Sequence, residues 1–151
     1  MKKYFYTFLI ALFFVTTPEV LAQGGQKTED KKGEVVVMNH ALFLEEVFDY
    51  NQSETWKFQG KKPVIIDLYA DWCGPCRKTA PIMEKLAKEY ADDIVIYKVD
   101  VDKERELAAL FNATSIPLFV FIPMDGQPQL FKGAADHATY KRAIDEFLLN
   151  K

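Results

Sequence analysis

The feature that most constrains this chain is the run Trp-Cys-Gly-Pro-Cys at residues 72–76, which contains both of its cysteines. Just upstream, residues 63–70 form a short apolar run rich in β-branched side chains, as buried strands do. Downstream, apolar residues recur at helical spacing from Ile82 to Tyr90. We therefore expect this run to lie where a strand ends and a helix begins.

A cysteine in the first turn of a helix lies close to unpaired backbone N–H groups and to the positive end of the helix dipole. Both effects favour the thiolate form of Cys73. Cys76 follows one helical turn later, close enough to form a disulfide with Cys73. Two thiols placed in this way form a reversible two-electron couple, so the spacing predicts redox chemistry.

Three other interpretations of the cysteine pair are less favoured. A structural disulfide around two residues stabilises little, because the stabilisation increases with loop length. A zinc site needs four ligands, and the two histidines, His40 and His137, are far from the pair in sequence. Two unrelated free thiols would need neither Gly-Pro between them nor a strand–helix junction. We expect no metal and no cofactor.

The first 22 residues have the three parts of a secretory signal peptide. Two lysines form a positive start, residues 5–15 are apolar, and residues 20–22 end in the small-residue pattern that signal peptidase cleaves. The apolar part is too short to span a bilayer, and Gln23 stands where a lipid anchor needs a cysteine. We expect cleavage after Ala22 and export to the periplasm or another compartment outside the cytosol, without stable membrane insertion.

The composition describes one domain after a linker. Residues 23–34 are rich in glycine, lysine and acids and have no apolar residue, as is typical of a flexible linker. Residues 35–151 remain for the domain, and a chain of 151 residues with 49% hydrophobic side chains can bury a substantial core. The formal net charge is −3 and no basic patch is present, so nothing indicates a nucleic-acid partner.

Periodicity and turn residues predict five strands and four helices in this domain. The strands are expected at residues 35–38, 63–70, 94–99, 117–122 and 129–132. The last two strands are expected to form a hairpin. The helices are expected from a cap at Asn39 to about residue 50, through Pro81 to about residue 90, over residues 102–112, and onward from a cap at Asp136. The order β-α-β-α-β-α-β-β-α predicts an α/β fold with a mixed sheet and helices on both faces.

Two details of packing follow from the same patterns. The helix over residues 102–112 is expected to turn Leu107, Leu110 and Phe111 toward the core. Within the polar loop 51–62, Trp56 and Phe58 are expected to pack down on the domain.

Taken together, these features resemble the thioredoxin family, over about residue 35 to the C-terminus. The motifs that carry the resemblance are, in chain order, Asp67 six residues before Cys73, the 72–76 run, Pro81, Lys98, Ile116-Pro117 and Gly133. With its signal peptide the chain is similar to the exported, periplasmic thioredoxins of bacteria. Tyr69 departs from the many members that have tryptophan there, and residues 51–62 are longer than in the shortest members.

The resemblance implies a thioredoxin fold, with a mixed central five-stranded sheet flanked by four helices, and a protein-disulfide reductase. Cys73, at the exposed start of the helix, would attack a substrate disulfide. Cys76, more buried, would resolve the mixed disulfide. The resemblance also implies a cis peptide bond before Pro117, facing the cysteine pair. A substrate groove is then expected at Trp72, Gly74, Pro75, Ile116, Pro117 and Gly133.

Asp67 is the one charged residue in its apolar strand, so it is more favourably interpreted as a buried acid than as a solvated one. Burial would raise its pKa and suit it to take the proton from Cys76. The resemblance implies the same catalytic role and gives Lys98 as its charge partner.

The expected partners are disulfide-containing proteins and a membrane electron donor that restores the dithiol, because a cytosolic reductase cannot reach an exported protein. We expect a monomer. Two alternatives remain: an exported disulfide oxidase or isomerase, and a non-catalytic binding module with the same fold.

Overall fold

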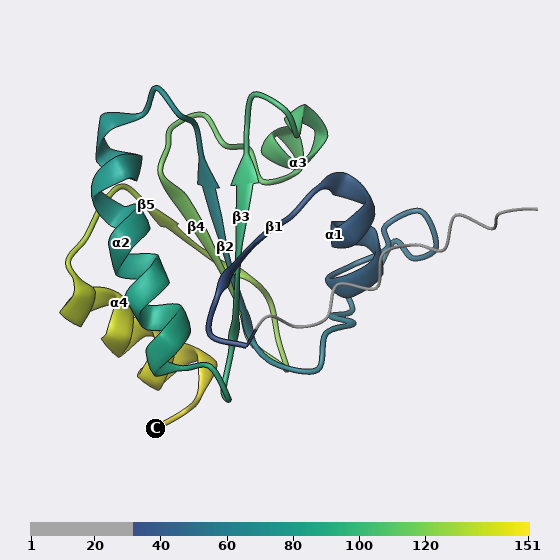
Figure 1. Ribbon diagram of the computed structural model, residues 1–151. Helices are drawn as coiled ribbons and strands as arrows, with labels where there is room; N and C mark the ends of the chain where they lie inside the picture. Colours follow the sequence, from purple (N-terminus) through teal and green to yellow (C-terminus); the bar gives the residue numbers. More distant parts are fainter. Residues whose placement is uncertain (1–31) are drawn as a thin grey trace, which may run out of the picture.

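A five-stranded mixed sheet in the order β1-β3-β2-β4-β5 forms the centre of the protein (Figure 1). This is a computed structural model, and it describes residues 32–151. The signal peptide expected at residues 1–22 and most of the linker expected at residues 23–34 lie outside the described residues. The last linker residues, 32–34, form a turn in which Lys32 pairs with Asp92 at 2.6 Å.

The strands are β1 (Val35–Val37), β2 (Val64–Tyr69), β3 (Val95–Asp100), β4 (Leu118–Ile122) and β5 (Gln129–Lys132). β3 runs parallel to both β1 and β2, whereas β4 runs antiparallel to β2 and β5. β2 therefore lies in the middle of the sheet, with neighbours on both edges and helices on both faces. Its nearly continuous apolar sequence is the pattern that such a strand requires.

The helices are α1 (His40–Glu46), α2 (Gly74–Glu89), α3 (Arg105–Leu110) and α4 (His137–Ala143), which continues as one π-helical turn (Ile144–Leu148). α2 and α4 cover one face of the sheet, and α1 and α3 cover the other (Figure 1). The predicted class and element order are confirmed.

Successive residues of β2 alternate between two separate cores, as the period of a strand requires. Ile65 packs with Met83 of α2 and Tyr140 of α4. Ile66 packs with Phe43 of α1 and Leu107 of α3 on the opposite face. Because β2 is fixed on both faces, the position of the residues that follow its end is fixed as well.

Both predicted helix caps and the hairpin are confirmed. Asn39 accepts a hydrogen bond from the Leu42 N–H at 2.8 Å, and Asp136 accepts one from the Thr139 N–H at 2.8 Å. β4 and β5 pair antiparallel, as the turn between them predicts. In the loop 51–62, Trp56 and Phe58 are partly buried against the core, as expected.

Two predicted helices are too long, and one predicted core residue is wrong. α1 ends at Glu46 rather than near residue 50, because the chain leaves the helix to bury the adjacent Val47 and Phe48. α3 begins at Arg105 rather than residue 102, because the Asp100 carboxylate accepts the Asp102 N–H and favours a turn.

Leu110, expected in the core, is 46% exposed, whereas Leu107 is fully buried. The short helix α3 turns one face to the sheet, and Leu110 lies at its end.

We expect Leu107→Ala to lower the free energy of unfolding by about 2–5 kcal/mol, because it leaves a cavity under α3. Leu110→Ala removes the same atoms from the same helix at an exposed position, and should change stability by about 1 kcal/mol or less. Equilibrium unfolding in urea compares the two variants. Equal losses would contradict the packing described for α3.

Candidate active site

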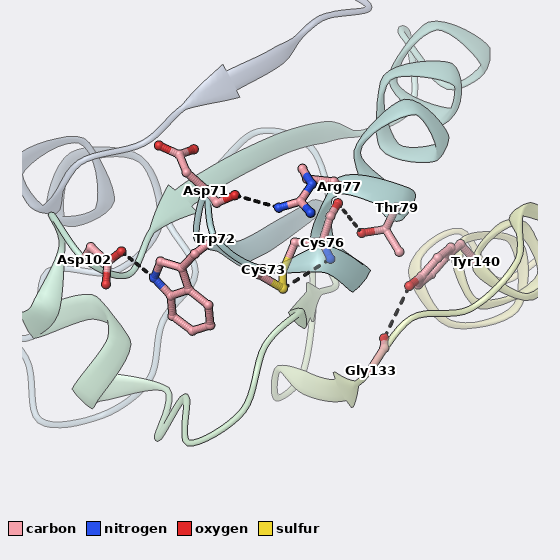
Figure 2. The surroundings of a disulfide bond; sticks show 9 residues. All are labelled: Asp71, Trp72, Cys73, Cys76, Arg77, Thr79, Asp102, Gly133 and Tyr140. Atoms are coloured by element: carbon pink, nitrogen blue, oxygen red, sulfur yellow. Dashed lines mark hydrogen bonds between the residues drawn. A yellow bond between two sulfur atoms is a disulfide. The ribbon is translucent and has the colours of Figure 1, made fainter.

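The two cysteines form a disulfide at the N-terminus of α2 (Figure 2), with their Cα atoms 5.3 Å apart. Cys73 is the N-cap residue of the helix, and its Sγ accepts a hydrogen bond from the Cys76 N–H at 3.2 Å. Gly74 and Pro75 form the start of the first turn, where proline is tolerated because its missing N–H would have no partner. A sulfur atom thus occupies the place that an oxygen occupies in most helix caps.

The charges of this first turn favour an anion at the sulfur. The dipole of a 16-residue helix has its positive end at Cys73, and no acidic side chain lies in the first turn. When the disulfide is reduced, a thiolate at Cys73 would supply a negative charge at this positive helix end. The predicted strand–helix junction is therefore confirmed, with Cys73 as the cap rather than inside the first turn.

Cys73 is not more exposed than Cys76, contrary to expectation. Both residues are 4% exposed and pack with Ala70 at the end of β2. The cap geometry explains why Cys73 is buried, because it turns the Cys73 sulfur back onto the helix. Trp72, by contrast, is 66% exposed, which suits the substrate groove in which the resemblance places it.

Sequence reasoning missed the partner of Trp72. The indole N–H donates a hydrogen bond to Oδ2 of Asp102 at 2.9 Å (Figure 2). Asp102 lies in the turn between β3 and α3, and its own N–H is held by the Asp100 carboxylate at 3.0 Å. Nothing in the sequence connects positions that lie 30 residues apart, so only the fold could reveal this contact.

Asp67 is buried in the middle of β2, as predicted, with 5% of its surface exposed. Among the described residues its Oδ1 has no hydrogen-bond partner. Burial raises the pKa of Asp67 to about 7, although the Lys98 cation acts in the opposite direction. Lys98 is the direct neighbour of Asp67 on β3. The acid can therefore change its protonation state near neutral pH.

A pocket of about 220 Å³ brings Asp67 and Cys76 together. Its lining also includes the half-buried Lys98. Lys98 Nζ lies 5.9 Å from the ring centroid of Tyr69, so the tyrosine that replaces the family's frequent tryptophan contributes to the same pocket. The predicted acid, its charge partner and the second cysteine thus share one cavity.

Pro117 lies beside this site, and the Ile116–Pro117 peptide bond is cis, as the resemblance implies. Ile116 packs against the cysteine pair. The Gly133 N–H donates to the Pro117 carbonyl at 2.9 Å, which joins the two loops that precede and follow the β4–β5 hairpin. Gly133 has a φ of 90°, a left-handed conformation that favours glycine.

The two histidines have separate structural contacts on opposite faces of the sheet. His40 of α1 contacts Glu106 and Tyr50, and His137 of α4 contacts Glu89. Over residues 32–151 there is no group of three or more His, Cys, Asp or Glu side chains that could hold a metal ion. In the same range, no helix has both the length and the apolar character that crossing a membrane requires.

Comparisons with known proteins agree on one family. The family model described as Thioredoxin matches residues 34–146. A thioredoxin of Borreliella burgdorferi is 43% identical over 105 residues, covering 70% of this chain and 90% of that protein. A thioredoxin of Mycobacterium tuberculosis is 34% identical over 124 residues, covering 82% and 97%. A solved mutant thioredoxin from Halobacterium salinarum has a TM-score of 0.62 and 26% identity, covering 78% of this chain and 93% of that one.

The burial of Asp67 predicts a pH dependence of stability. Folding raises the pKa of Asp67 from its ordinary 3.8 to about 7, so the folded protein binds this proton more tightly than the unfolded chain. The free energy of unfolding should therefore be highest below pH 4 as far as this group is concerned, and fall as pH rises to 7. The fall is about 4 kcal/mol at most.

Denaturant unfolding of the oxidised protein between pH 4 and 8 measures this slope. Asp67→Asn should remove most of it, whereas Asp71→Asn, a change at an exposed acid just after the same strand, should retain it. An unchanged slope in Asp67→Asn would show that another group causes it.

Proposed function

The chain belongs to the thioredoxin family and is a protein-disulfide reductase, and from this premise we propose that it reduces protein disulfides outside the cytosol, in the periplasm. The observation that supports the chemistry most directly is the position of the Cys73 sulfur as the cap of α2.

In the first step, the Cys73 thiolate attacks one sulfur of a substrate disulfide. A Cys73–substrate disulfide forms, and the other substrate sulfur leaves as a thiolate. The dipole of α2 and the Cys76 N–H stabilise the attacking anion, because they point at the Cys73 Sγ. The burial of Cys73 limits this attack to substrates that dock closely against the helix end.

In the second step, Cys76 loses its proton and attacks the Cys73 sulfur. The Cys73–Cys76 disulfide forms and the second substrate sulfur leaves as a thiolate, so the substrate gains two electrons and the protein loses two. We assign the proton acceptor as Asp67, which lines the same pocket as Cys76. Its raised pKa suits it to accept a proton near neutral pH. Lys98 would limit how far that pKa rises.

The substrate is proposed to bind as an extended segment beside the cis-proline loop. Among the described residues, neither the amide nor the carbonyl of Ile116 has a hydrogen-bond partner. These two groups are free to pair with a substrate strand. The exposed Trp72 and Pro75 and the half-buried Gly74 and Gly133 then form the sides of this groove.

The direction of transfer is proposed as reduction. A Gly-Pro pair between the cysteines resembles the reducing members of the family, for which the reduction potential is about −270 mV. The protein is proposed to act as a monomer and to be re-reduced by a membrane electron donor. Export is supported by the signal-peptide pattern of residues 1–22.

Reduction of insulin disulfides tests the assigned roles of the two cysteines. Cys73→Ser should abolish turnover, because it removes the attacking sulfur. Cys76→Ser should form the mixed disulfide and retain it, so that a covalent complex accumulates on a non-reducing gel. Turnover that survives in Cys73→Ser would contradict the mechanism, and so would a lack of complexes with Cys76→Ser.

The reduction potential of the wild-type protein distinguishes a reductant from an oxidase. It is measured by equilibrating the Cys73–Cys76 pair with a glutathione buffer. A reduction potential near −270 mV supports the reductant. A potential near −120 mV would instead indicate an oxidase. A wild-type protein that exchanges no disulfides would be a binding module.

The N-terminus of the exported protein tests the compartment. In a bacterium that expresses the full chain, mass spectrometry of the periplasmic fraction should find a protein that begins at Gln23. Ala22→Phe should block this cleavage, because the position requires a small side chain. A wild-type protein that begins at Met1 and stays in the cytosol would contradict export.

A further inference from the structure

Arg77, the residue directly after Cys76, reaches back over the first turn of α2. Its Nη1 donates a hydrogen bond to the backbone carbonyl of Asp71 at 3.0 Å (Figure 2). A Cβ atom added to Gly74 would lie 3.9 Å from Arg77 Nη2, so the guanidinium also passes beside the first residue of the helix. The side chain thus connects α2 to the segment that links the helix to β2.

Few contacts hold the backbone of that segment. The Cys73 N–H donates to the Ala70 carbonyl at 3.1 Å, which closes a turn around residues 71 and 72. Over residues 32–151, Arg77 is the only side chain that forms a hydrogen bond with the backbone of Asp71 or Trp72. Because Cys73 follows directly, its position as the cap of α2 depends on this backbone.

Helix stability does not explain a cation at this place. A positive charge in the first turn lies at the positive end of the dipole and is unfavourable there. Within the described residues, Arg77 forms no ion pair that would offset this effect. Lys78, the next residue, is also exposed and has neither a hydrogen bond nor an ion pair in the same part of the chain. Among the hydrogen bonds and ion pairs of these two exposed cations, the bond of Arg77 to Asp71 is the one that distinguishes them.

The bond also lies at the pocket that contains the acid. Asp71 and Arg77 line this pocket together with Asp67 and Cys76. Asp71 and Arg77 are exposed, whereas Asp67 and Cys76 are buried. The Asp71–Arg77 bond therefore forms part of the outer side of the cavity in which the resolving step takes place.

We propose that Arg77 is a positioning residue for disulfide exchange. Its bond to the Asp71 carbonyl holds the segment before Cys73 so that the attacking sulfur stays aligned with the Cys76 N–H. The inference rests on the proposed roles of the two cysteines and of Asp67. It adds a residue that acts through the backbone before Cys73.

The test compares Arg77→Met with Lys78→Met in the full chain. Both variants lose one positive charge in the same helical turn, but only Arg77→Met loses the hydrogen bond. We expect Arg77→Met to lower kcat/KM for insulin reduction about fivefold, the effect of one hydrogen bond of ordinary strength. Lys78→Met should keep the wild-type value within about twofold.

A second measurement separates positioning from a general loss of structure. In the reduced protein, the rate of Cys73 alkylation by iodoacetamide is measured from pH 5 to 9. For Arg77→Met, the pH at which the rate is half-maximal should move upward, because a displaced sulfur loses the stabilisation of the helix end. In Lys78→Met this midpoint should stay in place.

Equal shifts in the two variants would overturn the proposal, since they would assign the effect to charge alone. Wild-type behaviour of Arg77→Met in both assays would overturn it as well. If the wild-type protein itself failed to reduce insulin, the proposed function would fail. The alkylation profiles would still decide whether Arg77 positions Cys73.

Discussion

The reactive end of this protein depends on one unusual helix cap. α2 begins with a sulfur rather than an oxygen, and the Cys73 Sγ accepts the N–H that the first turn leaves unpaired. The same N–H and the same dipole that stabilise the helix also stabilise a thiolate. The stability of the helix start and the stability of the Cys73 thiolate therefore depend on the same contact. A change that moves the Cys73 sulfur away from the helix axis weakens both.

The second constraint is an acid in the middle of the sheet. Asp67 occupies a position of β2 whose neighbours Ile66 and Leu68 are fully buried. Burial favours the neutral acid, and the Lys98 cation on the adjacent strand favours the carboxylate. Together these two effects bring the pKa of Asp67 to about 7. Burial of an acid that is partly ionised at neutral pH also lowers the stability of the fold. Such a residue is expected where chemistry rather than folding determines the side chain.

The differences between prediction and structure have a common physical origin. Where a helix ends depends on what the following residues bury, so α1 ends early to place Val47 and Phe48 in the core. The exposure of Cys73 was predicted wrongly for a related reason. The prediction rests on the place of Cys73 at the start of a helix, whereas the cap geometry turns its sulfur inward. In both cases, packing decided the detail that a local pattern left open.

The sequence by itself determined what depends on near neighbours: the strand–helix junction at the cysteines, the caps Asn39 and Asp136, and the acid in an apolar strand. These interactions span a few residues, and residue type and spacing specify them. Only the tertiary structure decided which distant groups form bonds, such as the indole of Trp72 with the carboxylate of Asp102. Such contacts arise when the sheet places separate loops at one edge, and no local pattern encodes that placement.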